Sequence, residues 1–176
     1  MNATKIGMKY EFQLALRYLL AVALALFTQP MYYIMAPVTL YASYFLLNIF
    51  HPASLEGIKI FTEQGTFVFV EACVATLAYL LLAILILTTK NIGFRKSVAI
   101  FLHGSLIIFV VNIFRIELLI YAFLTGKDFD VIHIFFWEFV STLLVFLTWM
   151  YLIKKYKVKT MPVFSDAHYL WKNIRK

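Results

Sequence analysis

The chain of 176 residues is 63% hydrophobic and 14% charged, with a formal net charge of +7. Soluble domains average about half apolar and a quarter charged residues, so this composition excludes a water-soluble globule, and the ample apolar surface excludes a disordered chain. The basic residues lie in separate segments that form no nucleic-acid-binding face, and the single cysteine excludes an intramolecular disulfide and a cysteine zinc cluster.

Long apolar runs predict an all-α integral membrane protein in which residues 1–176 form a single membrane domain. About 20 apolar residues cross a bilayer as a helix. The expected spans are four in number, at about 18–35, 72–88, 98–124 and 131–153. Another apolar run, at 38–50, is too short for a span, so we expect a short interfacial or re-entrant helix at the outer surface.

The segment that follows this short run is more polar. It contains Gly57, Gly65 and two β-like stretches at 58–61 and 66–70. This pattern predicts a small extracytoplasmic hairpin, which completes an outer segment at 38–71.

The positions of the charges predict the orientation. Four spans place three segments on one side, and these hold 13 of the 16 basic residues: residues 1–17, 89–97 and 154–176. The opposite side receives seven of the nine acids. By the positive-inside rule, both termini and the basic tail at 154–176 are cytoplasmic. The most economical interpretation of the tail is an orientation anchor that contacts membrane lipid.

Three reactive side chains lie at one depth in this topology. Cys73 and His133 stand at the outer starts of their spans, and Arg115 lies about 27 Å along its helix from Ser97, near the outer edge of the core. A thiol beside a cation at a helix N-terminus has the setting of a nucleophile, and an imidazole can shuttle its proton. We therefore expect an active site near the extracytoplasmic face.

Each of these residues also has a simpler interpretation. Cys73 alone is most often a small packed hydrophobe. Arg115 alone can reach the outer headgroups, or pair with Glu117 or the acids at 128–130. His133 alone can stack at the interface near Trp137. Only their common depth favours a joint site.

The sequence around the three residues resembles the exosortase/archaeosortase family of membrane-embedded cysteine transpeptidases. The resemblance covers about 58–153, with the short outer helix before it, and rests on the words EAC at 71–73, NIFRI at 112–116 and FDVIH at 129–133. It implies that Cys73 is the nucleophile, Arg115 the essential arginine and His133 the third catalytic residue. The family commonly has Ser or Thr and then Gly after its cysteine, whereas Val74 and Ala75 follow here.

The resemblance implies a protein-sorting transpeptidase or protease of the plasma membrane. Its substrates are secreted proteins with a C-terminal motif, a spanning helix and a basic end, which pass through a cysteine thioester to a lipid or surface carrier. It needs no metal or organic cofactor and no nucleic acid. A non-catalytic membrane subunit or small transporter component is the alternative, and thiol reactivity of Cys73 discriminates between them.

Three further polar residues are candidates for supporting roles. Asn112 lies one turn before Arg115 on the same helix face, where it can brace the guanidinium. Glu71 and Glu138 can orient the histidine or the arginine, although both are equally interpretable as solvated interfacial carboxylates.

Overall fold

The computed structural model describes residues 3–26, 28–126, 134, 141–160 and 162–174, and it is mostly helical. Its elements, in chain order, are α1 (Ala3–Leu26), α2 (Gln29–Phe50), β1 (Ala53–Glu56), β2 (Lys59–Thr62), β3 (Gly65–Val68), the 3-10 turn η1 (Glu71–Val74), α3 (Thr76–Leu87), α4 (Phe94–Leu124), α6 (Ser141–Lys155) and α7 (Phe164–Ile174).

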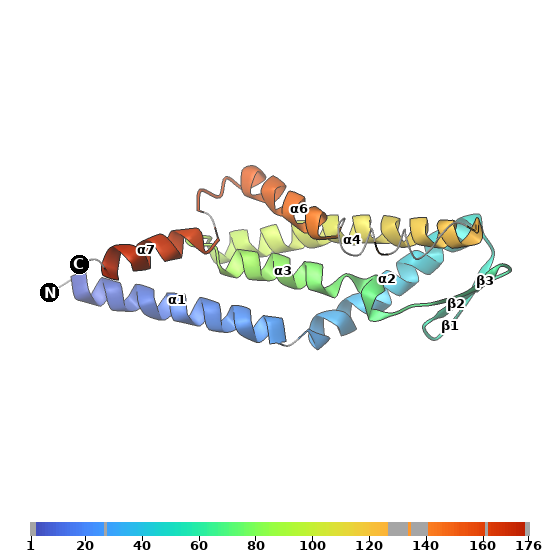
Figure 1. The fold of residues 1–176 in the computed structure, drawn as a ribbon, viewed down its shortest axis with the longest axis horizontal. Helices are drawn as coiled ribbons and strands as arrows, with labels where there is room; N and C mark the ends of the chain where they lie inside the picture. The colour runs from blue at the N-terminus through green and yellow to red at the C-terminus, as the bar shows by residue number, and fades with distance from the viewer. Residues whose placement is uncertain (1–2, 27, 127–133, 135–140, 161, 175–176) are drawn as a thin grey trace.

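The helices form an elongated bundle with both chain termini at one end and the sheet at the other (Figure 1). The first two helices run one after the other toward the sheet, α3 returns, α4 runs toward the sheet again, and α6 returns (Figure 1). At 1.5 Å per residue, α4 is about 46 Å long and so exceeds the roughly 30 Å core of a bilayer. Among the described residues, α2 and α4 are the two helices long and apolar enough to cross a membrane.

Helix α1 ends at Leu26 and α2 begins at Gln29, so the boundary implied by separate apolar runs at 18–35 and 38–50 is wrong. Pro30 occupies the first turn of α2, where a missing backbone N–H costs nothing, while Pro37 lies inside the helix. The Thr39 hydroxyl donates to the Met35 carbonyl in the same turn, 2.8 Å away. The run at 38–50 is thus the second half of a 22-residue helix and not a separate short one.

The other expected spans correspond only in part to the described helices. The helix expected at 72–88 begins at Thr76, after a 3-10 turn, whereas α4 ends at Leu124 as expected. In the span expected at 131–153, α6 begins at Ser141, and the residues before it lie outside the described part except for residue 134. The number of spans therefore stays a prediction.

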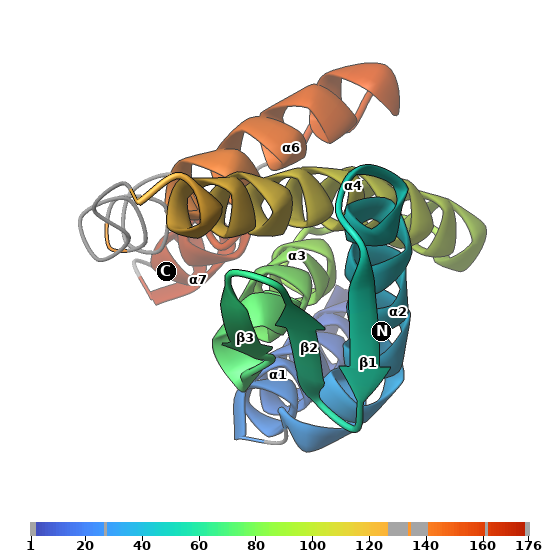
Figure 2. The same ribbon diagram turned by 90° about the vertical axis from the view of Figure 1, so that its right-hand side faces the viewer.

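In place of the expected two-stranded hairpin, the structure has a three-stranded antiparallel sheet. The sequence pattern predicted the second and third strands but missed the first, β1. Figure 2 looks onto this end of the molecule, with the strands in front of the bundle. Gly65, at the start of β3, has no room for a side chain, since a Cβ there would lie 2.9 Å from the Phe123 ring. Phe67 meets the same ring edge-on at 4.7 Å between centroids, so the sheet is fixed against the end of α4.

Two apolar clusters form the core. One lies under the sheet and joins Leu47, Ile60 and Phe69 to Ile116 of α4, and Cys73 packs against it. The other lies between α3, α4 and α6. There, α4 presents Gly104, where a Cβ would lie 2.5 Å from Leu82 and 2.8 Å from Leu152, so these three helices pack closely.

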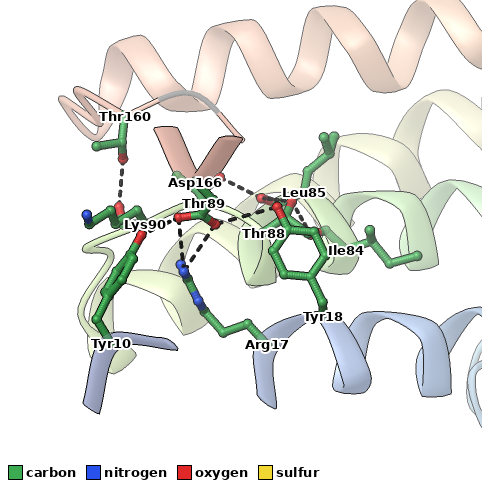
Figure 3. Close-up of polar contacts among 10 residues, drawn as sticks. All are labelled: Tyr10, Arg17, Tyr18, Ile84, Leu85, Thr88, Thr89, Lys90, Thr160 and Asp166. Carbon is green, nitrogen blue, oxygen red and sulfur yellow. Dashed lines mark hydrogen bonds and ion pairs between the residues drawn. The ribbon is translucent and has the colours of Figure 1, made fainter. Parts of the chain in front are cut away.

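The tail is folded back onto the bundle, whereas the sequence suggested only an orientation anchor. Figure 3 shows Tyr10, Arg17 and Tyr18 of α1 directed at Asp166 of α7. The Arg17 guanidinium donates to both carboxylate oxygens at 3.1 Å, and the two tyrosines donate at 2.5 and 3.5 Å. The segment before α7 is held as well, because Thr160 donates to the Lys90 carbonyl between α3 and α4. These contacts fasten the tail to the end that carries the termini.

Candidate functional site

Cys73 lies in the one turn of 3-10 helix that joins the sheet to α3. Its N–H donates to the Val70 carbonyl at 2.9 Å, and Val70 is still extended. Ala75 then takes a left-handed conformation, with φ 56° and ψ 34°, and α3 begins at the next residue. Left-handed backbone favours glycine, because a Cβ is strained there. The position at which the resembled family commonly has glycine is therefore the left-handed residue that links the cysteine turn to α3.

Two side chains of α4 hold this turn through its carbonyl groups. Arg115 donates from Nη2 to the Ala72 carbonyl at 2.8 Å, and Asn112 donates from Nδ2 to the Cys73 carbonyl at 2.7 Å. They lie three residues apart, on one face of the helix, and are only 7% and 3% exposed. Because adjacent carbonyls are bound from the same helix, α4 fixes the backbone that carries the thiol.

Asn112 was predicted to brace the Arg115 guanidinium, but its amide group binds a different partner. Its amide bonds the Cys73 carbonyl, and its Oδ1 has no partner in the described part of the chain. Asn112 and Arg115 thus act in parallel on the same turn. The three-residue spacing correctly placed Asn112 and Arg115 on one helix face. The sequence did not indicate which backbone groups the two side chains bind.

Arg115 also reaches α6, where its Nη1 donates to the Ser141 hydroxyl at 3.2 Å. Sequence reasoning missed Ser141, and its only signal is a hydroxyl residue within the last predicted span. Arg115 is buried and forms no ion pair with Glu117, so neither the headgroup interpretation nor the Glu117 pair describes it. Within the described residues, the guanidinium contacts neutral oxygens only, and its Nε is buried without a partner.

Besides a small space of about 40 Å³, Arg115 lines two larger cavities. One, of about 230 Å³, lies between the sheet and α4 and is lined by Cys73 and Arg115. The other, of about 490 Å³, lies on the α3 and α6 side and is lined by Arg115, Glu71, Thr76 and Ser141. A guanidinium that borders both spaces can contact groups bound in either of them.

The remaining predicted residues are placed as follows. Glu71 lies in η1, is exposed, and lines the larger cavity. His133 and Glu138 lie outside the described residues, so their predicted roles stay predictions. Within the described part, no three His, Cys, Asp or Glu side chains come together as metal ligands.

The thiol of Cys73 lies outside the apolar helix α3 and is half-buried. A thiol with an ordinary pKa is largely protonated at neutral pH. A nucleophile at this position therefore needs a base to take its proton.

Comparison with known proteins gives one match. The model of a family described as transmembrane exosortase matches residues 4–154. This range contains η1, α4 and the described part of α6 up to its penultimate residue, and it ends before α7. No curated protein and no solved structure matches the chain.

Proposed function

Because the chain belongs to the transmembrane exosortase family, we propose that it is a membrane-embedded cysteine transpeptidase that processes C-terminal sorting signals. Its substrates are secreted proteins that end in a short motif, a spanning helix and a basic tail. The acceptor is an amine or hydroxyl on a lipid or surface carrier, and water in its place makes the enzyme a protease.

One observation carries this proposal: the only cysteine of the chain lies on a turn that the buried Arg115 holds by the neighbouring carbonyl. Among the described residues Arg115 has no carboxylate partner, and a guanidinium held only by neutral groups is costly to bury. Its retention beside a half-buried thiol is expected where negative charge develops during a reaction. A merely structural arginine has no need of a cysteine or of two adjoining cavities.

In the proposed reaction, the Cys73 sulfur attacks the carbonyl carbon of the scissile peptide bond after His133 takes the thiol proton. The negative charge that develops on the carbonyl oxygen is stabilised by Arg115. The C–N bond then breaks, and His133 gives the proton to the leaving amine, which departs with the C-terminal anchor. The acceptor attacks the resulting thioester and gives its proton to His133. The C–S bond then breaks, and the leaving thiolate takes that proton from His133 to restore the thiol.

The same proposal places both termini in the cytoplasm and the site near the extracytoplasmic face. Four passages along the bundle support a four-span topology, with α1 and α2 together making the first passage (Figure 1). The basic residues between α3 and α4 and at the end of α6 lie at the end that carries the termini, which supports this orientation by the positive-inside rule.

Replacement of Cys73 tests the function. We expect Cys73→Ala to accumulate and fold as the wild type does but to leave a co-expressed secreted substrate at full length on a gel, because no other thiol exists in the chain. Wild type and Ser43→Ala, which removes a buried hydroxyl of α2, serve as controls. Normal processing by Cys73→Ala would instead favour a non-catalytic membrane subunit.

A further inference from the structure

The smaller cavity at the site lies beneath the sheet. Strands β2 and β3 contribute Ile60 and Phe67 to its walls, and α4 contributes Ile116 and Leu119. Apart from Cys73 and Arg115, every residue that lines it is apolar. Cys73 and Arg115 are thus the two residues with reactive or charged side chains along a cavity of about 230 Å³ whose other lining residues are apolar.

The packing around this cavity keeps it from collapsing. The sheet above it is fixed to α4 by the contact of Gly65 and Phe67 with Phe123, and Ile60 is only 1% exposed. Unfilled apolar space lowers stability, because its lining loses van der Waals contacts. Apolar cavities of about 150 Å³ stay dry and admit benzene, so this one has room for an aromatic or large aliphatic side chain.

We propose that this cavity is a specificity subsite for an apolar side chain of the sorting signal, namely that of the residue whose carbonyl Cys73 attacks. The inference rests on the proposed function and adds the chemical class of the residue at the cleavage point. With that side chain among Ile60, Phe67 and Leu119, its carbonyl carbon lies at the mouth of the cavity beside the thiol. The carbonyl oxygen is then within reach of Arg115.

The polarity of the walls supports this occupant over a charged one. A carboxylate or ammonium group in this cavity would lose its hydration, and among the wall residues only Arg115 offers it a charge. An acidic side chain there would also occupy the guanidinium that the developing oxyanion needs. The larger cavity, with Glu71, Thr76 and Ser141, has the polar lining that the smaller one lacks.

The single cysteine allows a direct test with the full-length protein in its membrane or in detergent. Peptidyl chloromethyl ketones alkylate a thiol: the C–S bond forms, chloride leaves, and the thiol proton passes to the buffer. Labelling rates are measured for acetyl-phenylalanyl, acetyl-leucyl, acetyl-alanyl and acetyl-glutamyl ketones. The labelling rate of each ketone is divided by the labelling rate of iodoacetamide. Iodoacetamide has no amino-acid side chain, so this ratio corrects for the general reactivity of the thiol.

We expect the normalised rate with the phenylalanyl and leucyl probes to exceed that with the glutamyl probe by about tenfold or more, and that with the alanyl probe to lie between. Leu119→Trp fills the cavity and should remove the preference. Leu106→Trp, at a position 60% exposed on the same helix, should retain it and controls for partition of apolar probes into lipid. Normalised rates within twofold for all four probes would overturn the subsite.

A second variant keeps the test decisive if Leu119→Trp does not fold. Leu119→Ala enlarges the cavity and should raise the normalised rate of a naphthylalanyl ketone relative to the phenylalanyl one by about fivefold, since shape now favours the larger group. No change in that ratio would also overturn the subsite. Failure of the proposed function has a different signature, because Cys73→Ala would then process substrate normally whatever the preference among probes.

Discussion

Two largely buried arginines of this chain have partners of different charge. Arg17 donates to both oxygens of the Asp166 carboxylate, which is 2% exposed and also accepts from two tyrosines (Figure 3). Arg115 donates to the Ala72 carbonyl and the Ser141 hydroxyl, and in the described part of the chain no carboxylate reaches it. Among the described residues, Arg17 is therefore paired with a counter-charge, whereas Arg115 is held by the dipoles of neutral groups.

The difference separates a structural arginine from one that suits a reaction. A paired charge is already stabilised, so a new negative group nearby gains little from it. An unpaired guanidinium in a water-poor setting stabilises developing negative charge strongly, and its fixed position avoids reorganisation during the reaction. The family model matches both Arg17 and Arg115, but it ends before Asp166, so the pairing of Arg17 depends on a segment beyond the match.

The largest effect that we expect from this comparison follows replacement of the unpaired arginine. Arg115→Lys keeps the charge but loses the planar fork that binds two oxygens, so the initial rate of substrate cleavage should fall about a hundred- to a thousandfold. Arg17→Lys is the matched control and should stay within about threefold of wild type at equal protein level. Equal, small effects of both changes would assign Arg115 a structural role like that of Arg17.

The second effect concerns stability at the other end of the bundle. Asp166→Ala leaves Arg17 without its counter-charge, and we expect the free energy of unfolding to fall by about 3 kcal/mol, the lower end for a broken buried pair, because the Arg17 side chain keeps 21% exposure. Denaturation in mixed detergent measures it. Arg17→Met combined with Asp166→Leu should recover most of the loss, and cleavage per folded molecule should be unchanged throughout.

The third effect compares the two side chains of α4 that hold the cysteine turn. Asn112→Ala removes the donor to the Cys73 carbonyl and should cost about 1–3 kcal/mol in unfolding free energy, because a buried acceptor loses its bond. Thr148→Val is the control, since the Thr148 hydroxyl is buried without a partner among the described residues, and its loss should be nearly neutral. An Asn112→Ala protein as stable as wild type would contradict the holding role.

The smallest expected effect is a gain in stability at Ala75, the left-handed residue before α3. Ala75→Gly relieves about 1–2 kcal/mol of left-handed strain and costs roughly 0.5–1 kcal/mol in backbone entropy, so we expect a net gain of about 0.5–1 kcal/mol in unfolding free energy. Ala78→Gly, inside α3, lacks the strain and should lower stability by about 1 kcal/mol. The same sign for both changes would contradict the left-handed conformation of Ala75.

Sequence reasoning was most accurate where the signal is local. The N-x-x-R spacing placed Asn112 and Arg115 on one helix face, and glycines flanking short β-like runs indicated strands after the first long helices. It was wrong where competing local signals have equal strength. Pro30 and Pro37 both follow apolar runs, and only packing of α2 against α4 decides that the helix continues through the second proline.

The sequence by itself determined the membrane character and the helical class, because composition and periodicity are properties of neighbouring residues, and its local motifs resemble the family that the family model then matched. Tertiary structure alone decided which groups those residues bind: carbonyls of one turn for Asn112 and Arg115, and a carboxylate about 150 residues away for Arg17. Those partners lie on segments that are distant in the sequence and are brought together by burial of apolar side chains. The same burial determines how strongly solvent screens each charge. Hence the sequence contains both arginines, but only the fold shows that Arg17 binds a carboxylate and that the described partners of Arg115 are neutral.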